Sequence, residues 1–192
     1  DAVQSALARV WRPEQAGFSI RTADAGVVQL ESSRIFLEDA VVRAVRELPG
    51  AQPALTYLVN RIGHGDKSTP YSFVAAGPVP PGTPEGAVVV GRWLADTLGV
   101  APGGTLDMEW YELGSSNEFI TRRGEFPVHA VLPMEDLAEE RALAPRFPGL
   151  SDVDSCRDWD IGMPLEEEAL DDPANEEYWK TYGQTPKLMV SF

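Results

Sequence analysis

The feature of this sequence that most constrains its fold is a strict alternation of side chains over residues 105–113. Leu106, Met108 and Trp110 alternate with acidic residues and a tyrosine. Successive side chains of a strand point to opposite faces, so a period of two predicts a strand with one buried face. A half-buried strand needs neighbouring strands to pair with, and the chain is therefore expected to contain a sheet.

The other expected strands are short runs of apolar and β-branched residues bounded by glycine, proline or aspartate. They cover residues 18–22, 27–31, 54–62, 71–76, 87–90, 118–132 and 188–192. The turn residues at 23–26 make the first two runs a hairpin. Glycines within 63–67 predict a loop that separates the strand at 54–62 from the strand at 71–76.

Helical periodicity is clearest over residues 36–48, where apolar side chains recur on one face and charged side chains on the other. Ser33 is a candidate start of this helix, and Pro49 and Gly50 end it. Shorter helices are predicted at 1–12, 92–98 and 135–143. The fold class is therefore mixed, α+β, with the 36–48 helix packed on a sheet that includes 54–62, 71–76, 105–113 and 118–132.

The chain has 192 residues, which is enough for a real core, and we expect a single domain over 1–192. Residues 77–86 hold four prolines and three glycines and predict an irregular crossing. This crossing leaves a second organisation open, with two intertwined lobes of about 1–86 and 87–192.

A long irregular segment, mostly loop, is predicted after Pro145, because prolines recur there and periodicity fades. The segment is too rich in large apolar residues for a solvated tail. We expect Trp159 and Trp179 to pack back onto the body of the domain, the acidic side chains to face outward, and Cys156 to be an unpaired thiol.

Charge limits the classes of partner. Thirty acidic and sixteen basic residues give a net charge of −14, and residues 151–192 alone carry eleven acidic and three basic side chains. Such a surface repels phosphate backbones, so nucleic acid is not an expected partner. No apolar run approaches the roughly 20 residues that span a bilayer. Because the chain starts at Asp1 within a helical pattern and stops on apolar residues, we expect it to be a fragment of a longer protein.

Four aspartates, Asp152, Asp154, Asp158 and Asp160, resemble a calcium-binding loop, since hard cations need several oxygens from a short segment. The match is incomplete. Counting from Asp152, the sixth residue is Arg157 where a glycine is needed, and the twelfth is Met163 where a bidentate glutamate belongs. The competing interpretation is that these aspartates cap helices and form a solvated rim.

The acidic and nucleophilic residues offer few candidate catalytic constellations. Glu166–Glu168 with Asp171 and Asp172 could supply the paired carboxylates of a glycoside hydrolase, although charge runs are usually solvated faces. His64 and His129 are the only imidazoles available to activate a serine or Cys156, and no Gly-x-Ser-x-Gly elbow exists. With the phosphate-binding loops and ligand clusters missing, no catalytic residue, ATP, nicotinamide or structural metal is expected.

Residues 87–132 carry a more specific pattern. An apolar run at Val88–Val90 is followed by Leu94 and Ala95, by Leu98-Gly99-Val100, by a Pro-Gly-Gly-Thr turn ending at Thr105, and by Phe126-Pro-Val-His-Ala-Val131. The order and spacing resemble the extracytoplasmic domain of FtsX-like, MacB-type ABC transporter permeases. Gly104 and Ala130 depart from the family pattern, which usually has aspartate and glycine there. The resemblance implies a MacB-type periplasmic-domain fold.

Further resemblance to a subgroup of large bacterial putative permeases rests on short motifs along most of the chain. They are Tyr57–Asn60, Pro70–Phe73, Phe147–Asp152, Cys156–Asp160, Glu177–Trp179 and Thr185–Lys187. The resemblance implies a non-enzymatic extracytoplasmic domain that contacts an unknown substrate or partner protein, or couples transport mechanically. It also implies flanking transmembrane helices and a cytoplasmic ATPase subunit. The alternative is a secreted carbohydrate or peptide hydrolase that uses the acidic C-terminal segment.

Overall fold

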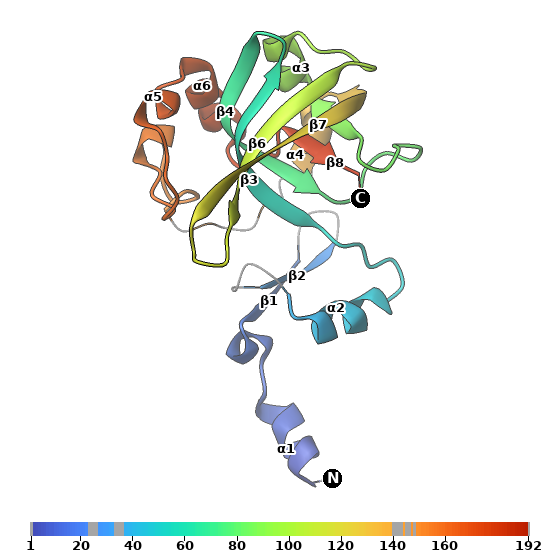
Figure 1. Ribbon diagram of the computed structural model, residues 1–192. Coiled ribbons are helices and arrows are strands. Elements are labelled where there is room, and N and C mark those ends of the chain that lie inside the picture. The colour runs from blue at the N-terminus through green and yellow to red at the C-terminus, as the bar shows by residue number, and fades with distance from the viewer. Residues whose placement is uncertain are drawn as a thin grey trace. The chain divides into compact units, whose positions relative to one another are not determined.

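The computed structural model describes residues 2–22, 27–32, 37–139, 144, 147 and 149–191. The chain divides into two compact units, Asp1–Gln52 and Pro53–Phe192. The fold is mixed α and β, as the sequence predicts, with most strands in the second unit (Figure 1). Among the described residues, no helix combines the length and the apolar composition needed to cross a membrane.

The N-terminal unit contains two helices and a two-stranded sheet. In chain order its elements are α1 (Ala2–Val10), a 3-10 turn (Pro13–Ala16), β1 (Phe18–Thr22), β2 (Val28–Ser32) and α2 (Asp39–Arg46). β1 and β2 pair antiparallel, which confirms the predicted hairpin strands, while its turn at 23–26 and the candidate helix start at Ser33 lie outside the described residues.

The helix predicted at 36–48 is shorter than expected, and its predicted packing on the main sheet stays a prediction. α2 belongs to the N-terminal unit, not to the unit that holds the main sheet. None of its residues is buried; Val41, Val42 and Val45 are half-buried. Amphipathic periodicity identifies the helix but not the surface that its apolar side chains meet.

The second unit is built on a closed barrel of six strands, in the order β3-β4-β8-β5-β7-β6. The strands are β3 (Leu55–His64), β4 (Lys67–Ala76), β5 (Val88–Gly91), β6 (Thr105–Leu113), β7 (Phe119–Leu132) and β8 (Leu188–Val190). β3 pairs antiparallel with β4 and β6, and β6 pairs antiparallel with β7. The remaining seams are parallel for β5–β7 and β4–β8 and antiparallel for β5–β8. The barrel takes strands from both sides of residue 86.

The barrel core is filled mainly from its own strands and from α3 (Arg92–Leu98). Its buried members are Val59, Ile62, Val74, Val88, Val90, Leu94, Ala95, Leu98, Val100, Leu106, Met108, Val128 and Leu188. Leu106 and Met108 point into this core, which confirms the alternation that predicted β6. Burial of so many aliphatic side chains, each stabilising by about 1.5 to 3 kcal/mol, fixes the register of the strands.

The loop predicted at 63–67 is shorter in the structure. β3 and β4 continue toward each other until His64 pairs with Lys67, which leaves only Gly65 and Asp66 in the turn. β4 thus begins at Lys67 and passes through Pro70 rather than starting at residue 71. Two central residues are the usual length of a tight hairpin, and Gly65 adopts the positive φ that such turns require.

Residues 149–187, called the strap below, lead from the short helix α4 (Met134–Glu139) to β8. The strap was predicted as mostly loop, which is only partly correct. It contains a 3-10 turn (Cys156–Asp158), α5 (Glu167–Leu170) and the ten-residue helix α6 (Pro173–Tyr182). Pro173 lies in the first turn of α6, where its missing N–H costs nothing, and the Asp172 side chain accepts a hydrogen bond from the Asn175 amide. α5 and α6 lie beside β4 (Figure 1).

Candidate functional site

The most unusual side chain of the described structure is a lysine in the interior. Lys187 immediately precedes β8 and is only 2% exposed. Its backbone amide donates to the Phe73 carbonyl at 2.9 Å, and its carbonyl accepts from the Gly91 amide at 2.9 Å. Lys187 is thus held between β4 and β5 before its side chain makes any contact.

The Lys187 ammonium is satisfied by oxygens and aromatic rings. Nζ donates to Thr69 Oγ1 at 2.9 Å and to Asn175 Oδ1 at 2.6 Å. It also lies 4.7 Å from the centre of the Trp93 ring and 4.9 Å from that of Tyr178, within cation–π range. These partners come from β4, α3 and α6, so a single amine connects three separate elements. We call Lys187 and these four partners the Lys187 centre.

Burial changes the acid–base behaviour of the two reactive side chains here. It disfavours the charged ammonium and lowers the pKa of Lys187 to about 7. Burial, reinforced by the negative charge of Glu176, raises the pKa of Cys156 to about 12. At neutral pH the thiol is therefore protonated and a poor nucleophile. Cys156 contacts Asn175 instead, whose side-chain amide lies 3.8 Å from Sγ.

An apolar cluster adjoins the Lys187 centre and joins the strap to the barrel. Its buried members are Leu58, Tyr71 and Phe73 from the barrel and Leu150, Cys156, Trp159, Leu170 and Trp179 from the strap. The rings of Trp159 and Trp179 meet edge to face at 5.0 Å, and Trp179 Nε1 donates to the Val153 carbonyl at 3.3 Å. This confirms the prediction that both tryptophans pack on the body of the domain.

Tyr71 is a strained member of this cluster. Its φ of 27° is rare for a residue with a side chain, and its ring is buried. The hydroxyl accepts a hydrogen bond from the Glu166 amide at 2.6 Å, which attaches the start of α5 to β4. The surrounding contacts therefore hold a backbone conformation that the chain would otherwise avoid.

A small cavity adjoins the Lys187 centre. Its walls include Tyr71, Phe73, Trp159, Asn175 and Lys187, and its volume is about 10 Å³. A water molecule needs roughly that much space. The cavity therefore has no room for a sugar ring or a peptide, and the amine next to it is not placed to act on a substrate of that size.

The four aspartates considered as a calcium site are all exposed. Asp152 accepts a hydrogen bond from the Gly149 amide at 2.7 Å, and the Asp160 amide donates to the Gly149 carbonyl at 2.9 Å. Within the described part of the chain, no group of three or more acidic, histidine or cysteine side chains is placed to hold a metal ion. Asp152 and Asp160 contribute to the turn that starts the strap.

We expect calcium to bind this segment no more tightly than the millimolar range of weak extracellular sites. Isothermal titration of the 192-residue chain with CaCl₂ at physiological salt measures this directly. The incomplete loop pattern and the exposed positions of Asp154 and Asp158 are the physical reasons. A micromolar dissociation constant would contradict the prediction.

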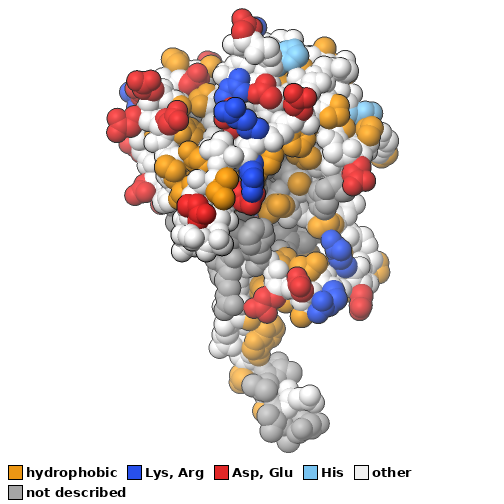
Figure 2. Space-filling model, in the orientation of Figure 1, with side chains coloured by type: hydrophobic (Ala, Val, Ile, Leu, Met, Phe, Trp, Pro, Cys, Tyr) orange, Lys and Arg blue, Asp and Glu red, His pale blue; other side chains and the backbone are white. Residues whose placement is uncertain are grey.

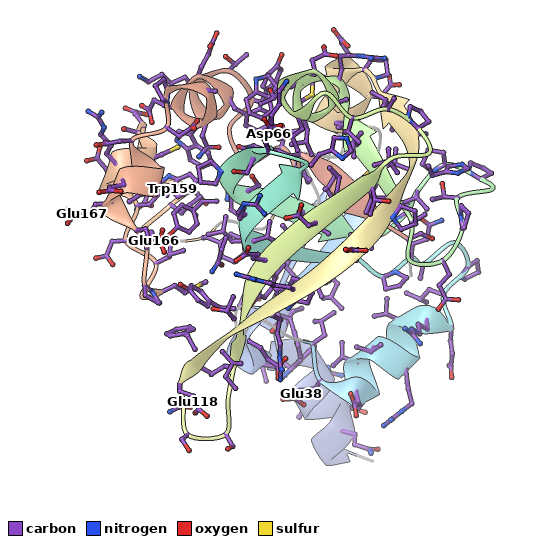
Figure 3. All side chains as sticks on the ribbon, turned by 45° about the horizontal axis from the view of Figure 1, so that its top comes forward. Glu38, Asp66, Glu118, Trp159, Glu166 and Glu167 are labelled. Carbon is purple, nitrogen blue, oxygen red and sulfur yellow. The ribbon has the colours of Figure 1, made fainter. Side chains whose placement is uncertain are left out.

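Two of the acidic residues considered for hydrolysis, Asp171 and Asp172, serve the local structure of the strap. Asp171 forms an ion pair with Arg157 at 2.6 Å, and Asp172 caps α6. Glu166, Glu167 and Glu168 are exposed. Figure 3 shows that the labelled Asp66, Glu118 and Glu167 come from separate elements and do not converge.

Neither histidine is among the partners of the Lys187 amine. His64 ends β3, and its Nδ1 lies 2.8 Å from the Thr105 carbonyl oxygen. His129 is exposed on β7. Neither imidazole has a hydrogen bond to Cys156, whose Sγ contacts Asn175.

Gly149 offers a test of how the strap begins. It has a φ of 80°, and a Cβ there would collide with the backbone oxygen of Asp160. Gly149→Ala should destabilise the second unit by at least about 2 kcal/mol, because positive φ and a backbone clash add. Gly82→Ala is the matched control: its φ is 88° but a Cβ would meet nothing within 4 Å, so only about 1 kcal/mol is expected. Equal losses in urea unfolding would mean that the Gly149–Asp160 contact is absent.

Strands β3, β6 and β7 carry charged side chains that form ion pairs between neighbouring strands. Arg61 pairs with Asp107, Arg123 with Glu109 at 3.3 Å, and Arg122 with Glu112 at 2.8 Å. Figure 2 shows basic and acidic side chains interspersed on the face that it draws. This arrangement provides no uniform basic surface for a nucleic acid.

Sequence reasoning did not single out Lys187, Thr69 or Asn175. The available signal was the Thr185–Lys187 motif, because a charged lysine stands directly before an apolar run that is expected to be buried. The motifs quoted for the permease subgroup nevertheless converge here. Tyr71 and Phe73, Cys156 and Trp159, Tyr178 and Trp179, and Lys187 all belong to the Lys187 centre or to the adjoining apolar cluster.

No protein-family model matches this chain, and no curated protein matches it either.

Proposed function

We propose that this chain is a non-enzymatic extracytoplasmic domain of a bacterial ABC transporter permease, with a barrel of the MacB periplasmic type. In this proposal flanking transmembrane helices belong to the same parent chain, and a separate cytoplasmic ATPase supplies the energy. The domain contacts a substrate or partner protein outside the membrane, or transmits movement between the membrane and such a partner.

The observation that carries the proposal is the way residues 87–132 fold. The residues on which the resemblance rests form β5, α3, a turn, the start of β6 and part of β7, and β5 pairs with β7 in parallel. The turn is fastened to β7 by two hydrogen bonds of 2.8 Å, from the Gly103 amide to the Val128 carbonyl and from the Val128 amide to the Gly104 carbonyl. The residues of the permease-like pattern therefore contact one another in the fold, as expected if the pattern encodes a shared fold.

The contacts of the reactive side chains within the chain support the non-enzymatic part of the proposal. The Lys187 amine and the Cys156 thiol bind partners within the chain, and the adjoining cavity holds about one water. The carboxylates considered for hydrolysis pair with Arg157, cap a helix or face solvent. These arrangements support a structural use of the strap rather than catalysis.

The location of the domain can be tested in the full-length parent protein. The turn at Gly82 should tolerate an inserted epitope, because a Cβ at Gly82 would meet nothing within 4 Å. We expect an antibody to bind intact spheroplasts, whereas the same epitope on the ATPase subunit is detected only after lysis. Detection of the Gly82 epitope only after lysis would refute the extracytoplasmic location.

The secreted-hydrolase alternative predicts different behaviour of the same protein. It expects the tagged chain in the culture medium, without an associated ATPase, and turnover of a glycoside or peptide substrate. We expect instead that the tagged protein fractionates with membranes and co-purifies with an ATPase, with no hydrolysis above the level of a Glu166→Gln, Glu168→Gln, Asp172→Asn variant. Recovery of a soluble, hydrolytically active protein would replace our proposal with the alternative.

A further inference from the structure

We infer that the strap is a latch: docking of the strap and closure of the barrel are one event, coupled through Lys187. The inference does not depend on the proposed function. It rests on the position of β8, which is the only strand between β4 and β5 in the barrel order and which begins at the residue after Lys187.

The seam between β4 and β5 is closed entirely by the end of the chain. β8 pairs with both strands, and four flanking backbone hydrogen bonds continue the pairing. They run from Lys187 to Phe73, from Gly91 to Lys187, from Ser191 to Ala87 and from Gly86 to Ser191. Removal of β8 would leave β4 and β5 with unpaired edges, which are sites for pairing with another extended segment.

Lys187 belongs to the seam and to the strap at the same time. Its backbone bonds both walls of the seam, while its side chain reaches Asn175 on α6. If α6 moved away while β8 stayed in place, the buried amine would lose its contacts with Asn175 and the Tyr178 ring. If β8 moved away while α6 stayed in place, the amine would lose the same contacts with Asn175 and Tyr178. Either partial opening breaks bonds of a buried ammonium, so the two movements favour each other.

The residues next to Lys187 strengthen the coupling. Leu188 is buried in the barrel core, and Met189 is buried in a separate cluster with Met134, Leu137 and Tyr178. The Tyr178 hydroxyl also donates to the Thr185 carbonyl at 2.9 Å, which ties α6 to the segment entering β8. Alternate residues of β8 are thus held by the barrel and by the strap.

Hydrogen exchange of the 192-residue chain tests the latch at identified amides. The seam is reported by Gly91 and Ser191, and the strap by Glu176 and Gly183, whose amides bond Asp172 and Trp179. We expect Lys187→Met to lower protection at both sets by the same factor, at least about tenfold, because it strands the Asn175 and Thr69 oxygens. Gly114, in the distant β6–β7 turn, should change less.

Two further variants keep the test decisive. Lys180→Met removes an exposed lysine of the same helix, paired only with Glu176, and should leave both sets unchanged. Thr69→Val removes a single acceptor of the amine and substitutes for Lys187→Met if that variant does not fold. Loss of protection in the strap with an unchanged seam, or unequal factors in the two sets, would show that the strap opens independently and would overturn the inference.

Discussion

Replacing Trp179 with alanine is expected to destabilise the second unit by about 3 to 5 kcal/mol, the usual cost of deleting a buried indole. The side chain is 9% exposed, packs edge to face on Trp159 and donates to the Val153 carbonyl. A loss of this size is a large part of the 5 to 15 kcal/mol that stabilises a typical domain. Urea unfolding followed by far-UV circular dichroism measures it.

Trp11→Ala is the control for this variant, since it deletes the same side chain where it is 52% exposed. Its effect should stay within about 0.5 kcal/mol. Limited proteolysis can contradict the expected role of Trp179. If limited proteolysis removes the residues after about 150 and the remainder melts at an unchanged temperature, the strap is an independent appendage and Trp179 supports nothing outside it.

The stability of the second unit is expected to rise with pH between about 7 and 9. Lys187 has a pKa of about 7 in the folded state, whereas an unfolded lysine titrates near 10.4. In this window the unfolded chain binds a proton at Lys187 that the folded chain has released, so raising the pH favours folding. The slope from this group approaches about 1 kcal/mol per pH unit.

Cys156 limits the pH range over which stability rises, at its upper end. Its pKa is raised to about 12, so above about pH 9 the folded chain retains a proton that the unfolded thiol loses, and this loss of stability offsets the gain from Lys187. Lys187→Met should abolish the rise between pH 7 and 9, and Cys156→Ala should extend it to higher pH. A wild-type unfolding free energy that is flat from pH 7 to 9, or a Lys187→Met variant with the wild-type slope, would contradict this assignment.

Local patterns predicted most of the strands because each strand carries its own burial pattern. The alternation at Leu106, Met108 and Trp110 identifies β6, and the apolar run at Val88–Val90 identifies β5. The barrel was not predictable in the same way. Its closure depends on pairing three residues, Leu188–Val190, with strands about a hundred residues earlier, and no local pattern encodes that pairing.

The helix α6 is hard to predict from the sequence because Pro173 looks like an interruption of any helical pattern. Asp172 and Pro173 are in fact a cap and a first-turn residue, a combination that begins helices. The Lys187 centre was missed for another reason. Lysine is almost always exposed, and only the three-dimensional meeting of β4, α3 and α6 supplies the oxygens and rings that make its burial tolerable.

Titration of the Lys187 amine tests most directly whether this side chain is buried between strap and barrel. Two-dimensional NMR that correlates the lysine ε carbon and ζ nitrogen, assigned with Lys187→Met, follows each amine separately in the 192-residue chain. We predict a midpoint near pH 7 for Lys187, well below the value of about 10.4 for a lysine in an unfolded chain. A Lys187 midpoint near about 10.4 would show a solvated amine and would contradict the described centre.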